Sequence, residues 1–268
     1  MTGQKTGNGD GRLAGSIVVI TGASSGIGAE MARQFVSRNA YVIVTARNLA
    51  KLQELARELG EQCEYAVLDV TSMEEIEQCV GSIIGQHGRI DVWINNAGHG
   101  MFEAFTDASL ERIDDMMNVN YMGTVRCTKA VLPHMLKSGR GQIVNIASLA
   151  GKIGSAKGSG YSASKHAVLG FTNSLRQEVA EAGVIVTAIN PGPIDTPFFN
   201  HADPTGHYVN NIKWMMLKPE KVAAKIVQAV IRGKKEVDMP LLPALGAKLV
   251  QLFPRLMDGW AGKLVNKK

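Results

Sequence analysis

A tyrosine and a lysine stand four positions apart in the run YSASK at residues 161–165. On a helix, this spacing places the phenol of Tyr161 and the ammonium of Lys165 on one face. The pKa of a free phenol is about 10. A positive charge about 4 Å away, at an effective dielectric near 20, stabilises the phenolate by roughly 4 kcal/mol, which lowers that pKa by about three units. We therefore predict that Lys165 prepares Tyr161 for proton transfer near neutral pH.

Ser148 ends the run IVNIAS at residues 143–148, a short distance before Tyr161. Its hydroxyl could hold a carbonyl oxygen while Tyr161 supplies a proton, a pairing that suits reduction of a carbonyl or oxidation of an alcohol. Farther upstream, Asn120 lies in the run NVNYMG at residues 118–123. An amide inside an otherwise apolar helix is costly unless it is hydrogen-bonded, so Asn120 is expected to have buried partners.

A glycine-rich turn, TGASSGIG at residues 21–28, follows the first apolar run of the chain. Its glycines permit a tight turn and a close approach of backbone to a pyrophosphate. The helix that follows would offer free N–H groups and a positive dipole end to phosphate. An ordinary Gly- and Ser-containing turn is the alternative interpretation of this run taken alone.

The second apolar run ends in Ala46, Arg47 and Asn48. In dinucleotide-binding folds, an acidic residue near this point hydrogen-bonds the adenosine ribose and favours NAD. Here a guanidinium stands instead, and it can bind a 2′-phosphate through two hydrogen bonds with no adjacent carboxylate to repel it. The sequence therefore predicts NADP(H) as the cofactor, with a surface arginine at a strand end as the alternative.

Three further turns follow apolar runs and carry polar or small residues. They are LDVT at 68–71, NNAG at 95–98 and NPGPIDT at 190–196. Asn side chains hold turn backbone in place, glycine permits close approach, and proline fixes the turn, so these residues suit the walls of a cofactor site.

Together these runs resemble the motifs of the short-chain dehydrogenase/reductase family. The glycine turn resembles its TGxxxGxG element, and NNAG, VNxxG, YxxxK and PGxxxT follow in the family's order between residues 21 and 196. The resemblance covers about residues 14–240. It implies an oxidoreductase that transfers a hydride between nicotinamide and a carbonyl or secondary alcohol.

The resemblance also implies roles for individual residues. Ser148, Tyr161, Lys165 and Asn120 are the expected catalytic residues, with Lys165 also holding the nicotinamide ribose and Asn120 a water that links this lysine to solvent. Besides Tyr161 and Lys165, the expected cofactor-binding residues are Gly22, Ser24, Ser25, Gly26, Ile27, Gly28, Arg47, Asn48, Asp69, Val70, Asn96, Ala97, Gly98, Pro191, Gly192, Ile194 and Thr196. Many NADP-preferring relatives carry a basic residue where this chain has Ser25, which is a departure from the family pattern.

The elements that must position these residues alternate between strand and helix. Strands are expected at about 16–20, 41–45, 65–68, 91–94, 142–146, 184–189 and 236–239. Helices are expected near 27–37, 50–59, 73–86, 110–136, 161–180 and 219–231. This alternation predicts an α/β fold, a doubly wound, Rossmann-like parallel sheet of about seven strands with helices on both faces. Ligands in such sheets bind beyond the carboxyl ends of the strands, which is where the motifs fall.

We expect three segments along the chain. Residues 1–14 form a flexible leader, 15–240 the NADP-binding catalytic domain, and 241–268 an amphipathic C-terminal extension of that domain. An irregular substrate loop at 198–217, rich in aromatic residues and Met, predicts an apolar pocket lid. Some relatives that act on steroids or retinoids have comparable apolar C-terminal extensions, so the resemblance implies a lipophilic substrate. In the extension, the apolar residues at 245–264 recur at helical spacing, and Pro254 is expected to split them into two helices.

Composition argues against a disulfide-rich protein, a zinc protein and a membrane-spanning protein. The cysteines Cys63, Cys79 and Cys127 lack the spacing of a disulfide framework or a zinc site, and no metal is expected. No stretch approaches the roughly 20 apolar residues that span a bilayer. Residues 211–268 hold 12 Lys and Arg against 4 Asp and Glu. This excess favours a solvated basic face, with an anionic surface as the alternative.

The expected partners are a small carbonyl or alcohol substrate and a second copy of the chain, which would dimerise through the helices that carry Asn120 and Tyr161. No nucleic-acid partner is expected, and the predicted location is cytoplasmic. The segment 245–264 would pack on its own domain or on a dimer mate, or else make a peripheral membrane contact.

Two other functions stay open. An epimerase or dehydratase could use the same Tyr–Lys pair, but such relatives are longer and carry a TGxxGxxG turn. An NADP(H)-binding sensor or scaffold would not need the complete set of Ser148, Tyr161, Lys165 and Asn120.

Overall fold

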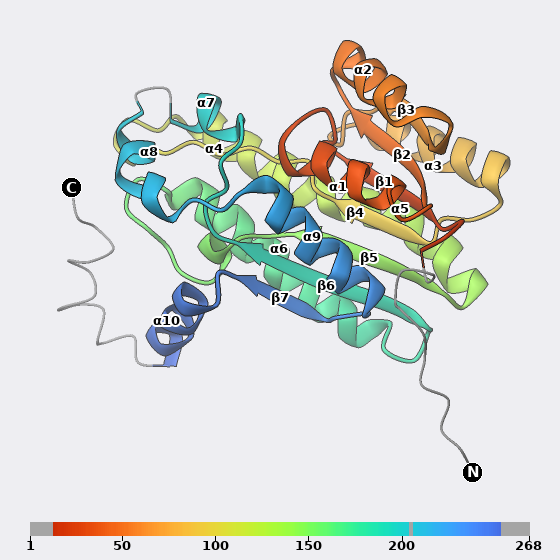
Figure 1. Ribbon diagram of the computed structural model, residues 1–268. Coiled ribbons are helices and arrows are strands. Elements are labelled where there is room, and N and C mark those ends of the chain that lie inside the picture. The colour runs from red at the N-terminus through yellow and green to blue at the C-terminus, as the bar shows by residue number, and fades with distance from the viewer. Residues whose placement is uncertain (1–12, 204–205, 253–268) are drawn as a thin grey trace, which may run out of the picture.

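Seven strands run parallel in one sheet in the computed structural model, which describes residues 13–203 and 206–252. The strands are β1 (Ile17–Thr21), β2 (Tyr41–Ala46), β3 (Cys63–Val67), β4 (Val92–Asn95), β5 (Gly141–Ile146), β6 (Val184–Pro191) and β7 (Glu236–Met239). Their order across the sheet is β3-β2-β1-β4-β5-β6-β7, so the chain crosses over between β3 and β4 (Figure 1). The predicted doubly wound sheet is confirmed, with β3 beginning two residues earlier than expected.

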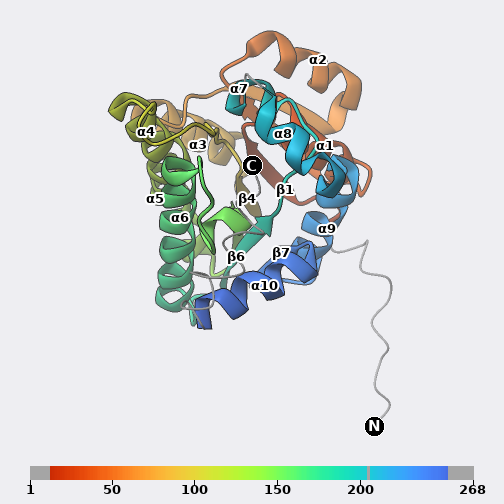
Figure 2. The ribbon, with the colours of Figure 1, turned by 90° about the vertical axis from the view of Figure 1, so that its left-hand side faces the viewer.

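Helices cover both faces of this sheet (Figure 2). One face carries α1 (Gly26–Val36), α2 (Leu49–Leu59) and α9 (Pro219–Ile231), and the other carries α3 (Met73–His87), α5 (Gly123–Ser138) and α6 (Ser159–Glu178). Successive side chains of a strand point to opposite faces. Val18 and Ile20 of β1 accordingly join the first apolar cluster, whereas Ile17 and Val19 join the second.

Buried amides and hydroxyls connect the centre of the sheet to two helices. Asn95 of β4 accepts a hydrogen bond from the Trp93 indole (2.8 Å) and donates to Asn145 of β5 (2.8 Å) and to Thr128 of α5 (3.1 Å). Asn145 in turn donates to Thr172 of α6 (2.9 Å). Because each of these polar groups is buried, the pairs fix the positions of α5 and α6 on the sheet.

Several short helices were not expected. The predicted irregular loop at 198–217 contains α7 (Phe198–Ala202), α8 (His207–Ile212) and the 3₁₀ turn η5 (Lys213–Met215). Helices of five or six residues span less than two turns, so they leave no 3.6-residue pattern in the sequence. Between α4 (Leu110–Met116) and α5, residues Met117–Met122 form the π-helical segment η3. Two further 3₁₀ turns, η2 (Gly60–Gln62) and η4 (Leu149–Gly151), precede β3 and α6.

The helix α10 (Leu241–Leu252) follows the edge strand β7 and is the described part of the expected C-terminal extension. Leu245, Leu249 and Leu252, which belong to its predicted apolar stripe, are each more than half exposed. The split at Pro254 falls outside the described residues. In the described ranges, no helix is both long enough and apolar enough to cross a bilayer.

The buried polar network predicts a measurable loss of stability for Thr172→Val. Valine keeps the shape of the side chain but leaves the Asn145 amide without its acceptor, which costs about 1–3 kcal/mol of unfolding free energy. Urea unfolding followed by circular dichroism measures the change. The exposed Thr106→Val is the matched control, with an expected change within about 0.5 kcal/mol. An equally small change for Thr172→Val would mean that the network does not stabilise the fold.

Candidate functional site

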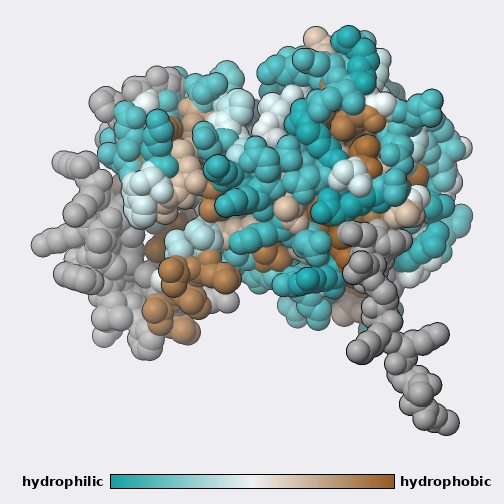
Figure 3. Space-filling model, in the orientation of Figure 1, coloured by the Kyte–Doolittle hydropathy of each residue, from teal (hydrophilic) through white to brown (hydrophobic). Residues whose placement is uncertain are grey.

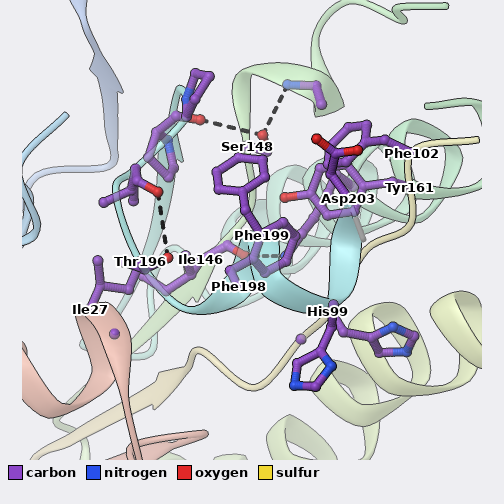
Figure 4. Close-up of a pocket in the computed structure, with 18 of the residues that line it drawn as sticks. Ile27, His99, Phe102, Ile146, Ser148, Tyr161, Thr196, Phe198, Phe199 and Asp203 are labelled. Atoms are coloured by element: carbon purple, nitrogen blue, oxygen red, sulfur yellow. Dashed lines mark hydrogen bonds between the residues drawn. The ribbon is translucent and has the colours of Figure 1, made fainter. Parts of the chain in front are cut away.

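One cavity of about 2620 Å³ lies at the carboxyl ends of the strands. Every predicted site residue except Asn120 lines it. Figure 4 shows Ser148 and Tyr161 in this cavity, with the rings of Phe102, Phe198 and Phe199 gathered beside them. The sheet therefore brings residues from turns more than 170 positions apart into one site, as the position of the motifs after strands predicted.

The glycine turn and the NNAG turn pack directly on each other. Gly22 has a positive φ of +64°, and a Cβ there would lie 2.7 Å from the Cα of Ala97. A Cβ at Gly28 would lie 2.6 Å from the Gly22 carbonyl oxygen and 2.7 Å from the Asn96 amide. Asn96 donates to the carbonyls of Thr21 (2.9 Å) and Gly22 (3.1 Å). Only glycine fits at positions 22 and 28, and this allows the backbones of the two turns to pack directly against each other.

The amino terminus of α1 faces the cavity with its N–H groups available. Within the described residues, its first turn contains no acid, and no side chain caps it. By contrast, Asn48, Ser72 and Ser109 cap α2, α3 and α4 through their side chains. Unpaired N–H groups and a positive dipole end suit a phosphate, so this turn fits the pyrophosphate of a dinucleotide.

Arg47 is exposed on the wall of the cavity, where its guanidinium is available to an anionic group. Asn48, its neighbour, accepts a hydrogen bond from the backbone N–H of Lys51 (3.0 Å) and so caps α2. Lys51 also lines the cavity but was missed, because one exposed lysine on an amphipathic helix is typical of a solvated face. Two cations therefore lie at this end of the cavity.

Asp69 is held in its turn by Thr71, whose N–H (2.9 Å) and hydroxyl (2.8 Å) both donate to its carboxylate. Partial burial works to raise the pKa of Asp69, but these hydrogen bonds and the charges of Arg47 and Arg126 hold it below its ordinary value. The carboxylate is thus ionised at neutral pH and available to accept a hydrogen bond from a base.

Ser148 is buried at the start of the 3₁₀ turn η4. Its hydroxyl donates to the Pro191 carbonyl (3.3 Å) and accepts from the N–H of Ala150 (3.1 Å). These bonds orient the hydroxyl between β5, β6 and the phenol of Tyr161 (Figure 4).

Lys152 anchors the turn η4 to β7 at the edge of the sheet, and no sequence pattern indicated this role. The Lys152 ammonium is buried and lies 2.6 Å from Asp238 and 2.5 Å from Glu236, both on β7. Asn190 donates to the same two carboxylates (2.8 and 3.0 Å). Burial works to lower the pKa of Lys152, but the two carboxylates raise it above its ordinary value. The lysine therefore stays charged and anchors the turn of Ser148.

The pKa values of Tyr161 and Lys165 differ from those expected from the sequence. Burial raises the pKa of Tyr161 to about 12, although the hydrogen bond with Ser148 works in the opposite direction. Burial also lowers the pKa of Lys165 to about 8. The Lys165 ammonium donates to the Ile146 carbonyl (2.9 Å) and lies 5.8 Å from the centre of the Tyr161 ring. The predicted lowering of the Tyr161 pKa is wrong for this structure, because burial is the largest influence on the phenol and raises its pKa.

Asn120 lies behind the cavity wall on the π-helical segment η3. Its amide donates to the His99 carbonyl (2.8 Å) and to Ser164 (2.9 Å), and its carbonyl accepts from the His99 N–H (2.9 Å). A Cβ at Gly98 would meet both the Asn120 oxygen (2.9 Å) and the Lys165 ammonium (3.5 Å). The expected buried partners are confirmed, and they fix Asn120 beside Lys165.

Aromatic rings form the wall around Tyr161. Phe102 lies 5.6 Å and Phe198 5.8 Å from its ring centre, and Phe102 stacks on Tyr208 at 4.1 Å. The Phe102 N–H also donates to the Ala202 carbonyl (2.8 Å), which joins the loop after β4 to α7. The sequence predicted the aromatic residues of 198–217, but no spacing indicated that Phe102 would join them.

The cysteines take no part in this site. Cys63 and Cys127 are buried, Cys79 is half-buried, and all three are free. Burial raises the pKa of each thiol, to about 12, 12 and 11 respectively, so they are poor nucleophiles at neutral pH. In the described ranges, no three His, Cys, Asp or Glu side chains are grouped to bind a metal ion.

Comparison with known proteins agrees with this geometry. A family model described as short chain dehydrogenase matches residues 16–206. The chain is 36% identical over 265 residues to YxnA, an uncharacterized oxidoreductase of Bacillus subtilis, covering 95% of this chain and 73% of that protein.

Two solved structures are also similar. A short-chain dehydrogenase from Streptomyces avermitilis has a TM-score of 0.80 at 29% identity, covering 91% of this chain and 95% of that one. A variant of actinorhodin polyketide ketoreductase with NADPH has a TM-score of 0.74 at 33% identity, covering 84% and 92%.

The lowered pKa of Lys165 predicts a specific pH dependence of stability. Between pH 8 and 10.5, the folded lysine binds fewer protons than the unfolded one, so its contribution to stability rises with pH. Relative to Lys165→Met, the wild-type unfolding free energy should gain about 3 kcal/mol across this window. Urea unfolding of both proteins at a series of pH values measures the difference. Parallel curves would contradict the lowered pKa.

Proposed function

The chain belongs to the short-chain dehydrogenase/reductase family, and we propose that it is an NADP(H)-dependent reductase of lipophilic ketones or aldehydes, or the reverse dehydrogenase. The observation that carries this proposal is the shared cavity. Ser148, Tyr161 and Lys165 line the same cavity as the α1 amino terminus and Arg47, so substrate and dinucleotide can meet in it. The bound nicotinamide would supply or accept the hydride.

The chain's own residues would handle the substrate oxygen and its proton. Ser148 would turn its single hydroxyl proton from the Pro191 carbonyl to the substrate's carbonyl oxygen, while the Ala150 N–H keeps the hydroxyl oxygen in place. Tyr161 would give its proton to the developing alkoxide. A pKa of about 12 supports this role, because the phenol is then protonated at neutral pH, which is the form that a reductase needs.

After Tyr161 has given up its proton, Lys165 would return a proton to it, and Asn120 would assist. A lysine whose pKa is about 8 exchanges its proton readily near neutral pH, and its ammonium favours any phenolate that forms at Tyr161. Asn120, fixed by His99 and Ser164, would orient the polar groups behind Lys165.

The aromatic wall supports an apolar substrate. Phe102 and Phe198 lie against the Tyr161 ring, and Phe199 and Tyr208 pack on Phe102, so the four rings offer flat apolar faces beside the proposed acid. Arg47, with Lys51 beside it, supports NADP(H) over NAD(H). The ketoreductase that resembles this chain is described with NADPH. Dimerisation and a cytoplasmic location stay predictions from the sequence.

Replacing the proposed acid tests the reaction. Tyr161→Phe should lower kcat by about 100-fold to 10,000-fold, because general acid catalysis contributes a factor of that size. NADPH consumption is measured by absorbance against a panel of ketones and aldehydes that ranges from small and polar to long-chain and aromatic. Tyr65→Phe, on β3 and away from the cavity, is the matched control and should keep wild-type turnover.

The panel also separates the alternatives. Turnover by the wild type that is lost in Tyr161→Phe supports the reductase. Tight NADPH binding without turnover of any panel member, unchanged in Tyr161→Phe, would instead favour the sensor or scaffold.

Replacing Arg47 tests the choice of cofactor. Arg47→Leu should raise the KM for NADPH by about 10-fold to 100-fold, which corresponds to loss of a charge-assisted hydrogen bond, and leave the KM for NADH nearly unchanged. Arg57→Leu, which removes the same charge from an exposed position of α2, is the control. Equal KM values for NADPH and NADH in the wild type would contradict the NADP(H) assignment but not the proposed reductase activity.

A further inference from the structure

The helix α10 exposes an unusual amount of apolar side chain. Leu241, Leu242, Leu245, Leu249 and Leu252 are between 56% and 81% exposed. They gather in one patch on the surface, which Figure 3 shows over α10. An exposed apolar patch of this kind marks a binding surface, since water contact with five leucines is unfavourable.

The charges of this segment are of one sign. Between Asp238 and Asp258, the sequence contains two charged residues, Lys248 and Arg255, and both are basic. The wider region 211–268 also carries an excess of basic residues, with 12 Lys and Arg against 4 Asp and Glu. Apolar helices with basic and no acidic residues suit the interface of an anionic bilayer, where leucines enter the lipid and cations meet the headgroups.

The same patch continues into the cavity. Pro243, Gly246 and Leu249 of α10 line it, and so does Trp214 of η5, which is 84% exposed. In Figure 1, α10 and α8, the helix directly before η5, lie on the same side of the molecule. Tryptophan at the edge of an apolar surface is typical of a membrane–water boundary. The cavity therefore opens beside the exposed leucines.

We propose that α10 rests on the surface of an anionic lipid bilayer, so that the mouth of the cavity opens at the lipid. Lipid contact accounts for the exposed leucines, for the basic charge and for the position of Leu249 and Trp214 at the rim. A second copy of the chain seated on α10 would satisfy the leucines but would also cover the rim where Leu249 and Trp214 line the cavity. The use of this mouth by substrate rests on the proposed function, whereas the lipid contact does not.

Vesicle sedimentation tests the contact. The full-length protein is mixed with vesicles of phosphatidylcholine, with or without phosphatidylserine, and the bound fraction is measured. We expect binding that phosphatidylserine strengthens and that added salt weakens. The double variant Leu242→Glu/Leu245→Glu, at positions that do not line the cavity, should bind at least about tenfold more weakly.

A matched control tests whether the loss of binding depends on the position of the two new glutamates or only on their charge. Leu110→Glu/Leu136→Glu makes the same two changes at exposed leucines of α4 and α5 and should bind vesicles like the wild type. Hydrogen exchange of the unaltered protein gives a second test that does not depend on the folding of any variant. Vesicles should slow exchange in α10 and leave α4 unchanged.

Three results would overturn the proposal. They are no sedimentation of the wild type with mixed vesicles, equal binding with and without phosphatidylserine, or equal binding by the α10 variant. A dimer in light scattering that this variant dissociates, without vesicle binding, would assign α10 to self-association instead. Because sedimentation requires no turnover, each of these results would leave the proposed reductase activity standing.

Discussion

The buried hydrogen bonds from Asn95 to Asn145 and from Asn145 to Thr172 hold the site together. They join β4 and β5 to α6, which carries both Tyr161 and Lys165, and Asn95 reaches α5 through Thr128. Apolar packing alone would let a helix slide or rotate on the sheet at small cost. Directional bonds between buried amides allow one position, because any shift leaves a polar group without its partner.

Burial sets the acid–base properties of the site. The same loss of water contact raises the pKa of Tyr161 to about 12 and lowers that of Lys165 to about 8, since each group is pushed toward its neutral form. A protonated phenol beside a lysine that releases its proton easily is an arrangement suited to donating a proton and regaining it. The aromatic rings that lie against Tyr161 therefore contribute to the burial that sets its pKa.

The sequence predicted the sheet and the residues that line the cavity because both depend on local patterns. Apolar runs mark buried strands, and the turn residues that follow them reach the carboxyl edge. Other features depend on contacts between segments that are far apart in the sequence, and local patterns do not indicate such contacts. Lys152 meets Glu236 and Asp238 from far along the chain, Phe102 joins α7 and α8, and the pKa of Tyr161 follows from the depth of its burial. The magnitude calculated for Lys165 assumed a separation of about 4 Å and ignored that burial.

The ion pairs of Lys152 also link the surface of the molecule to its centre. Asp238 lies on β7 just before α10 begins at Leu241, and the Gly192 N–H donates to the Met239 carbonyl at the same place. The helix at the surface and the turn of Ser148 are thus attached to a single short strand. A shift of α10 would therefore act first on β7, the strand that carries both carboxylates bound to Lys152.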